Sequence, residues 1–343
     1  MTTARLDGLD LAQLQRFFSD IGVPTEGELR AEPLSGGRSN LTFEVYDDTT
    51  RWVLRRPPTA GLTPSAHDVA REFRVCAALQ DSAVPVASTV VLCEDEAVLG
   101  APFSVTGFVD GRVIRTVDDL GTLTDGELGS CVDELVRVLA ALHTVDHRAV
   151  GLEEFGRPDG YLTRQVALWA RQWQRVKTRE LPDLERLHAQ LAEAIPSTSQ
   201  VAIVHGDYRI DNTILAAGDP GQVAAVVDWE MSTLGDPLAD LAQMCVYRNP
   251  ALDVILGEPA AWTSSRLPSP DELAQKYATV TGRNLDRWGF YLGLADFKLA
   301  VIAEGITHRH RAGATGGDGF AQAYQAVEPL VAAGLAALGE REQ

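Results

Sequence analysis

The stretch HGDYRIDN, residues 205–212, decides how this chain folds and what it can do. It places two carboxylates, a guanidinium, an imidazole and an amide between two apolar runs, at 201–204 and 214–215. Such runs are typical of short buried strands. A second stretch, VVDWE at 226–230, has the same character and supplies a further carboxylate at its centre. Polar groups that directly follow buried strands are candidates for a functional site.

The spacing of three of these residues indicates a metal–phosphate site. Asn212 follows Asp207 by five residues, and Asp228 follows Asn212 by sixteen. A turn at 218–221 would bring the two short strands together, and with them Asn212 and Asp228. An amide oxygen and a carboxylate are hard oxygen ligands suited to Mg²⁺, with phosphate completing the shell. Asp207 would lie nearby, placed to accept the proton of an attacking hydroxyl.

This order of residues resembles the catalytic loop of protein kinases followed by their metal-binding aspartate. Gly206 and Trp229 depart from the protein-kinase pattern and match instead the aminoglycoside phosphotransferase and choline-kinase-like family of small-molecule kinases. The segment GDPLADLA (235–242) is similar to that family too. Longer stretches, such as LRRPPTAGLTPSAHDVAREFRV (54–75), resemble the branch of kinase-like domains that are fused to, or accompany, acyl-CoA dehydrogenases. This likeness extends from about residue 30 to 330.

The predicted fold is α+β, of the bilobal protein-kinase type. Helical periodicity over 9–22, a hairpin at 41–55 and further Val-rich strands near 90–107 predict a β-rich N-terminal nucleotide-binding lobe over residues 1–108. The remainder is mainly helical, apart from the 201–230 region. We therefore expect a second lobe, residues 109–343, to hold the catalytic loop and the substrate site.

A glycine-containing turn and a strand arginine are the candidate phosphate-binding elements. Backbone N–H groups of SGGRSN can surround triphosphate oxygens, and no Walker A sequence occurs. Arg55 occupies the strand position at which kinases carry a lysine, and the helical Glu72 is its expected partner. The residues of the turn assigned to nucleotide binding are Ser35, Gly36, Gly37, Ser39 and Asn40.

Adenine is expected to contact the strand and the connector between the lobes. Strand alternation puts Val53 on the same face as Arg55. The connector backbone near Thr106 would hydrogen-bond to the base, and Phe108 would pack near it.

Other polar residues of these motifs are interpreted as supporting ones. His205 supports the loop backbone, Asp236 caps a helix, and Asp240 braces the catalytic loop. Asp211 shapes the turn. Arg209 either contacts the transferred phosphate or forms a surface salt bridge. Acceptor contacts are expected from the helical lobe, with Trp169, Trp173, Asp296, Lys298, Glu304 and Arg309 as candidates, although the i, i+4 spacing of the two tryptophans favours a place in the core for them.

Composition excludes several other classes of protein. A formal net charge of −18 argues against a nucleic-acid partner. No apolar run is long enough to cross a membrane. The four cysteines form no C-x-x-C pair, which favours a reduced, cytoplasmic location. No pattern indicates an oligomeric state.

The sequence thus predicts an ATP- and Mg²⁺-dependent phosphotransferase acting on a hydroxyl of a small molecule. The narrower resemblance implies a hydroxyacyl-CoA as acceptor, whereas the broader family implies an aminoglycoside or another antibiotic. The missing strand lysine leaves a third hypothesis open, a nucleotide-binding pseudokinase that acts as a sensor without transfer activity.

Overall fold

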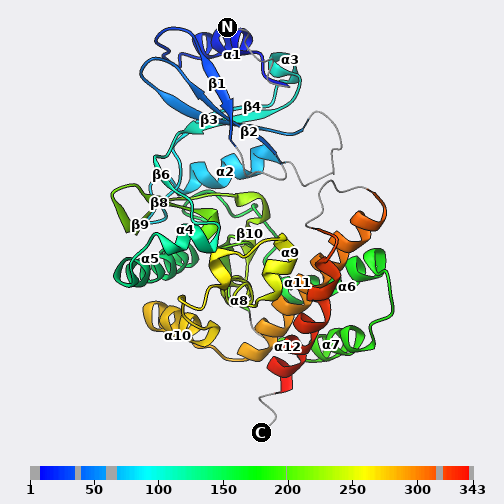
Figure 1. The fold of residues 1–343 in the computed structure, drawn as a ribbon. Helices are drawn as coiled ribbons and strands as arrows, with labels where there is room; N and C mark the ends of the chain where they lie inside the picture. Colours follow the sequence, from blue (N-terminus) through cyan, green and yellow to red (C-terminus); the bar gives the residue numbers. More distant parts are fainter. Residues whose placement is uncertain (1–7, 35–39, 59–67, 198, 314–319, 340–343) are drawn as a thin grey trace. The chain divides into compact units, whose positions relative to one another are not determined.

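The computed structural model describes residues 8–34, 40–58, 68–197, 199–313 and 320–339. The chain forms two compact units (Figure 1). The first consists of residues 1–110 together with a returning segment, 224–232. The second consists of residues 111–223 and 233–343. The returning segment carries Asp228, so this aspartate belongs to the first unit and the HGDYRIDN loop to the second.

An antiparallel five-stranded sheet in the order β1-β2-β3-β5-β4 forms the centre of the first unit. Its strands are β1 (Arg30–Pro33), β2 (Leu41–Tyr46), β3 (Arg51–Arg56), β4 (Thr89–Cys93) and β5 (Phe103–Gly107). The helices are α1 (Leu11–Asp20), α2 (Val69–Leu79) and α3 (Glu96–Leu99), and the returning segment adds the 3₁₀ turn η2 (Trp229–Met231).

Strand β3 shows why this sheet presents one face to a core and the other to a site. Trp52 and Leu54 are buried, and Phe18 of α1 packs edge-on against the Trp52 ring at 5.4 Å between centroids. The alternate residues Val53 and Arg55 are only partly buried and share the opposite face. This two-residue period follows from the pleat of the strand.

Helices make up most of the second unit. They are α4 (Val117–Gly121), α5 (Asp125–Thr144), α6 (Tyr161–Val176), α7 (Pro182–Glu193), α8 (Pro237–Val246), α9 (Ala251–Leu256), α10 (Pro270–Thr281), α11 (Trp288–Arg311) and α12 (Val327–Gly339), with 3₁₀ turns η1 (Ile210–Asn212), η3 (Ala261–Thr263) and η5 (Ala323–Ala326). Short strands are β6 (Gly111–Arg112), β7 (Ala202–Val204), β8 (Thr213–Ala216), β9 (Asp219–Val226) and β10 (Thr233–Gly235). Helix α11 is the central one, because it packs against α12, α8, α6 and α7.

Local sequence explains where several of these helices begin. Thr124 and Glu127 form a capping box at the start of α5, and Ser269 and Glu272 form another at the start of α10. In each box the hydroxyl and the carboxylate satisfy backbone N–H groups that the helix leaves unpaired. Helix α11 ends in the run His308–Arg311, and cationic side chains there interact favourably with the helix dipole.

The four cysteines are all buried and all unpaired. Burial raises the pKa of the Cys76 and Cys131 thiols to about 12. Thiols in this state are poor nucleophiles, which fits a structural part in the core. Among the residues that the structure describes, no helix has both the length and the apolar character that a membrane span requires.

Candidate active site

The HGDYRIDN loop connects two buried strands of the second unit. β7 is buried at every position and pairs in antiparallel fashion with β10, so the loop starts from a fixed point. Gly206 has a φ of +83°, which glycine adopts without the steric cost that a side chain would bring. The loop then closes through η1 into β8, where the Thr213 hydroxyl donates to the Ile210 carbonyl at 2.7 Å. These contacts carry the chain from one strand into the next within eight residues.

Asp207 and Asn212 are held together by the amide of the asparagine. Asn212 Nδ2 donates to the Asp207 carbonyl at 2.8 Å and to Asp207 Oδ2 at 2.9 Å. Asn212 is buried, whereas the Asp207 side chain retains 22% of its exposure. With both amide protons committed to Asp207, the Asn212 Oδ1 atom stays available as an acceptor or a metal ligand. The loop therefore presents a carboxylate and an amide oxygen from one rigid turn.

A buried chain of polar groups supports the start of this loop. Asp240 of α8 accepts hydrogen bonds from the backbone N–H groups of His205 at 2.7 Å and Gly206 at 2.8 Å. The same carboxylate lies 3.1 Å from His143 Nε2, and His143 Nδ1 lies 2.6 Å from the Tyr277 hydroxyl. Although burial opposes the charge of Asp240, the contacts with His143 and His205 hold its pKa below the ordinary value. The interpretation of Asp240 as a brace agrees with this geometry.

The other two supporting residues also have structural contacts. Asp236 is the N-cap of α8 and accepts the Leu238 N–H at 2.9 Å. His205 is fully buried, and its Nδ1 atom accepts the Asp207 N–H at 3.3 Å.

Arg209 was considered either as a contact of the transferred phosphate or as part of a surface salt bridge, and its surroundings decide against the second role. Its guanidinium pairs with Asp211 at 2.5 Å, lies 3.6 Å from Asp207 and stacks over the Tyr247 ring. The Arg209 side chain is only 14% exposed. Burial raises the pKa of Asp211 to about 6, against the opposing effect of the Arg209 charge. A plain surface salt bridge is therefore excluded, and a partly buried cation stands beside the predicted catalytic aspartate.

In the first unit, Arg55 and Glu72 form the ion pair that the sequence predicts. Arg55 Nη1 lies 2.7 Å from Glu72 Oε2, and Asn40 Nδ2 donates to Glu72 Oε1 at 3.2 Å. The second guanidinium nitrogen of Arg55 lies 3.9 Å from Asp228 Oδ1. Four of the predicted site residues thus meet in one place, on the partly buried face of β3 beside α2.

The surroundings of Glu72 disfavour its charged form. Burial raises its pKa to about 7, and the negative charges of Asp228 and Glu230 act in the same direction, whereas Arg55 and Asn40 oppose them. A cation placed between these carboxylates would relieve this repulsion.

The backbone of the returning segment fixes the position of Asp228. Its φ of +65° and ψ of +60° are left-handed values, uncommon for a residue with a side chain. Trp229 is buried and donates its indole N–H to the Val226 carbonyl at 3.0 Å. Arg71 of α2 donates to the Ser232 carbonyl at 2.9 Å. Helix α2 therefore positions both Glu72 and the segment that carries Asp228.

The remaining predicted nucleotide contacts lie along β3 and β5. Val53 and Thr106 are register partners across the two strands, and both are partly buried. Phe108 follows β5, donates its N–H to the Arg51 carbonyl at 3.1 Å and lies 3.6 Å beneath the Arg51 guanidinium. Ser35, Gly36, Gly37 and Ser39 lie outside the described residues.

The acceptor candidates of the helical unit have different environments. Trp173 is buried, and Glu304 accepts from the Thr178 N–H at 2.8 Å and hydroxyl at 2.6 Å, so both belong to the core. Arg309 is exposed near the end of α11. Lys298 donates to the Gly206 carbonyl at 3.1 Å.

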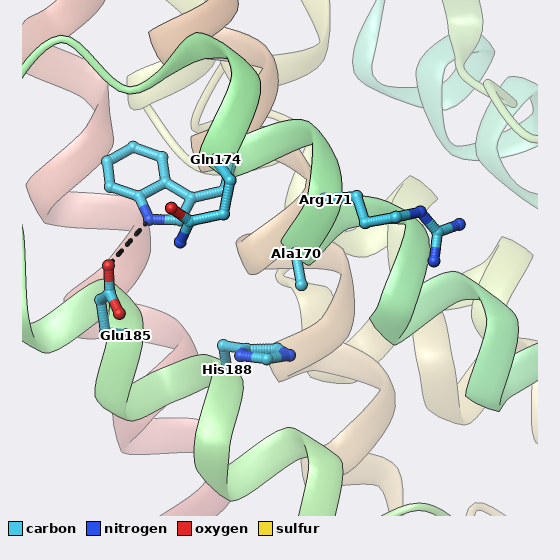
Figure 2. Close-up of a pocket in the computed structure, with 6 residues that line it drawn as sticks. Ala170, Arg171, Gln174, Glu185 and His188 are labelled. Atoms are coloured by element: carbon cyan, nitrogen blue, oxygen red, sulfur yellow. Dashed lines mark hydrogen bonds between the residues drawn. The ribbon is translucent and has the colours of Figure 1, made fainter.

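A small cavity of about 200 Å³ lies on helices α6 and α7 (Figure 2). Its lining consists of Ala170, Arg171, Trp173, Gln174, Glu185 and His188. The Trp173 indole N–H donates to Glu185 at 3.3 Å across one side. Asp207 and Asn212 do not line this cavity, so it is not the catalytic site.

Three contributors to the site were not identified from the sequence. Tyr247 lies beside Asp207, Arg71 holds the returning segment, and His143 orients Asp240. Tyr247 directly follows α8, Arg71 lies in α2 and His143 in α5, and each contacts a residue at least 40 positions away along the chain, so no local spacing connects them. Within the described residues, no group of three or more His, Cys, Asp or Glu side chains could hold a metal ion by itself. A magnesium site here would need oxygens from a phosphate or from water.

Comparison with known proteins places the chain among characterised sequences. The chain is 33% identical over 328 residues to human acyl-CoA dehydrogenase family member 11, covering 94% of this chain and 42% of that protein. It is 32% identical to the probable acyl-CoA dehydrogenase IBR3 of Arabidopsis thaliana, covering 86% of this chain and 38% of that protein. This chain thus spans about two fifths of the length of these relatives.

Solved structures show the same fold. A protein of Ralstonia eutropha assigned to the aminoglycoside phosphotransferases superposes with a TM-score of 0.84 at 32% identity, covering 97% of this chain and 99% of that one. A thermostable mutant of aminoglycoside phosphotransferase APH(4)-Ia, in a ternary complex with AMP-PNP and hygromycin B, gives a TM-score of 0.62 at 17% identity, over 94% and 99% of the two chains. The predicted α+β, protein-kinase-like fold is therefore confirmed. A family model described as the phosphotransferase enzyme family matches residues 30–275, and the chain belongs to this family.

Proposed function

We propose that this protein is an ATP- and Mg²⁺-dependent kinase that transfers the γ-phosphate to a hydroxyl group of a small molecule. Residues 1–108 act in nucleotide binding, and residues 109–343 carry the catalytic loop and the acceptor site. The observation that carries the proposal is the pairing of Asn212 with Asp207, at 2.8 and 2.9 Å, in a loop whose backbone is braced by Asp240.

The residues on the nucleotide side fit the phosphates of ATP. Arg55, held by Glu72, offers a cation to the α- and β-phosphates, and Val53, Thr106 and Phe108 offer a surface to the adenine. Arginine presents a planar fork rather than a point charge, and it suits phosphate oxygens in pairs. The turn at 35–40 would add backbone N–H groups.

Asn212 and Asp228 are the residues that would hold Mg²⁺. The Asn212 amide protons are committed to Asp207, which leaves its oxygen as the ligand atom. Asp228 has a side chain that is 39% exposed, so its carboxylate can reach a metal–phosphate complex. When bound there, Mg²⁺ would supply positive charge to neutralise the phosphates.

The chemistry assigned to the protein is mostly positioning. The acceptor oxygen forms a bond to the γ-phosphorus as the bond between that phosphorus and the β-bridging oxygen breaks, and ADP leaves with the electron pair. Asp207 orients the acceptor hydroxyl and takes its proton. Because phosphoryl transfer passes through a loose transition state, alignment and charge neutralisation dominate over proton removal.

We propose a hydroxyacyl-CoA as the acceptor class. The support is that this chain is similar to about two fifths of the length of proteins named acyl-CoA dehydrogenase family member 11. An aminoglycoside or another antibiotic is the second candidate, supported by the Ralstonia structure at 32% identity.

A transfer screen tests the proposal directly. Purified protein, ATP and Mg²⁺ are incubated with hydroxyacyl-CoAs, aminoglycosides and macrolides, and phosphorylated product is measured by mass spectrometry. We expect product with a hydroxyacyl-CoA, and Asp207→Asn should lower turnover by roughly 10² or more. Wild-type rates in the Asp207→Asn protein would refute the role of this residue.

The sensor hypothesis makes a different prediction in the same assay. A pseudokinase would show a thermal shift with ATP and Mg²⁺ but no transfer to any acceptor. The ion pair of Arg55 with Glu72 argues against the sensor hypothesis. Arg55 pairs with the same helical glutamate that the strand lysine of an active kinase would contact.

A further inference from the structure

The peptide unit between Gly206 and Asp207 is held from both sides. Its N–H, which belongs to Asp207, donates to His205 Nδ1 at 3.3 Å. Its carbonyl, which belongs to Gly206, accepts from Lys298 Nζ at 3.1 Å. Rotation of this peptide plane would turn the Cα of Asp207 and move its carboxylate. The two contacts therefore fix the direction in which Asp207 points.

Lys298 comes from the most firmly packed helix of the second unit. It lies in the middle of α11, between the buried residues Phe297 and Leu299. Its ammonium stands 5.8 Å from the centroid of the Trp169 ring, on α6. A lysine held between two packed helices has little freedom to leave the carbonyl.

The positive charge of Lys298 lies near two carboxylates of the site, those of Asp207 and Asp240. Burial lowers the pKa of Lys298, while the carboxylates of Asp207 and Asp240 act in the opposite direction. The lysine is thus a cation near both the predicted catalytic residue and the residue that braces it. Asp240 holds the N–H of Gly206 at 2.8 Å, and Lys298 holds the C=O of the same residue.

From this geometry we infer that Lys298 is a positioning residue for phosphoryl transfer, which clamps the Gly206–Asp207 peptide and thereby aims the Asp207 carboxylate. This inference rests on the proposed function for its catalytic consequence, but the clamp itself is a property of the folded chain. It replaces the sequence-based expectation that Lys298 contacts the acceptor. A positioning residue changes kcat, whereas an acceptor contact changes KM for the acceptor.

Three substitutions separate the functions of the side chain. Lys298→Met removes both the donor and the charge, Lys298→Gln keeps a neutral donor, and Lys298→Arg keeps both. Lys276→Met is the matched control, because Lys276 is an exposed lysine of α10 whose salt bridge to Asp133 has no part in the site.

The kinetic arm uses the acceptor that the wild-type protein phosphorylates. We expect Lys298→Met to lower kcat by roughly tenfold, the effect of one hydrogen bond to a charged donor, with KM for ATP and for the acceptor nearly unchanged. Lys298→Arg should restore most of the rate. Because removing a partly buried ammonium relieves its desolvation, the thermal midpoint of Lys298→Met should not fall. A loss of kcat that follows a loss of thermal stability, or a rise in acceptor KM alone, would overturn the inference.

A second arm does not depend on activity. Hydrogen–deuterium exchange of the apo protein is measured by mass spectrometry for peptides that cover residues 203–212. In Lys298→Met, exchange of this segment should be roughly tenfold faster, while α5 and α10 keep wild-type protection. Unchanged exchange in 203–212 would refute the clamp. Faster exchange in a protein that transfers phosphate to no acceptor would keep the clamp and reject the kinase proposal.

Discussion

At the scale of single residues, the spacing of the motifs predicts which side chains meet, but it does not predict how each hydrogen bond is made. The five-residue interval from Asp207 to Asn212 was enough to expect a shared loop, and the structure joins them through Nδ2. The contact from Lys298 to Gly206 spans 92 residues, so no local pattern reveals it. Arg209 could not be assigned for the same reason, because its burial depends on Tyr247.

Asp228 combines an uncommon backbone conformation with a predicted metal-binding role, and the two can be separated. Asp228→Asn keeps a side chain that tolerates the left-handed region, whereas Asp228→Ala does not. We expect Asp228→Ala to lose metal-dependent turnover and about 1 kcal/mol of stability, the usual cost of such strain. Asp228→Asn should lose turnover with little change in the thermal midpoint. Equal midpoints for both variants would contradict the strain argument.

Glu72 should make stability depend on pH. Its pKa is about 7 in the folded chain against an ordinary 4.5, so between these values the folded state binds the proton more tightly than the unfolded one. Stability is therefore greatest on the acid side and declines as pH rises through this window, by up to about 3 kcal/mol from this group alone. We expect Glu72→Gln to match wild type at pH 5 and to be more stable at pH 8.

The measurement is urea unfolding of both proteins without nucleotide or metal, at each pH. Comparing the variant with wild type removes the contributions of titrating groups that do not interact with Glu72. A difference in unfolding free energy that stays constant from pH 5 to pH 8 would contradict the elevated pKa.

At the scale of elements, periodicity predicted the first helix, the hairpin and the Val-rich strands of the N-terminal unit, because that signal is local. The alternation on β3 put Val53 and Arg55 on one face, as the structure has them. What periodicity could not show is that residues 224–232 return to the first unit. That return depends on contacts such as Arg71 with Ser232, which are 161 residues apart.

Two helical glycines should respond to the same substitution in opposite ways. A Cβ added to Gly289 of α11 would stand 2.2 Å from the Ala337 carbonyl of α12, whereas one added to Gly129 of α5 would meet nothing within 4 Å. Gly129→Ala should stabilise the protein by about 0.5–1 kcal/mol through helix propensity. Gly289→Ala should destabilise it by about 1–3 kcal/mol, because the two helices must move apart.

Thermal unfolding monitored by circular dichroism compares these two variants with wild type. Activity should follow the wild type in Gly129→Ala, since a Cβ at this position meets no other atom within 4 Å and leaves the contacts of His143 and Leu135 with the site unchanged. A higher midpoint for Gly289→Ala would show that the α11–α12 contact yields more easily than its geometry indicates.

At the scale of the whole molecule, the net charge of −18 sets how ligands approach. An anionic acceptor such as an acyl-CoA is repelled and a polycationic aminoglycoside is attracted, and both effects are screened by salt. Raising ionic strength from about 20 to 150 mM should lower KM for an anionic acceptor and raise it for a cationic one, each by roughly two- to threefold. Steady-state kinetics at fixed free Mg²⁺ measures this. A neutral acceptor of the same screen serves as control.

The burial of the cysteines gives a means of timing how each of the two units unfolds. Cys76 and Cys93 belong to the first unit, and Cys131 and Cys245 to the second. Since all four thiols are shielded in the native chain, a pulse of alkylating reagent modifies only molecules that have opened. Mass spectrometry of the labelled peptides then reports separately on each unit, with the natural sequence and no introduced probe. The natural cysteines therefore allow the unfolding rate of each unit to be measured separately.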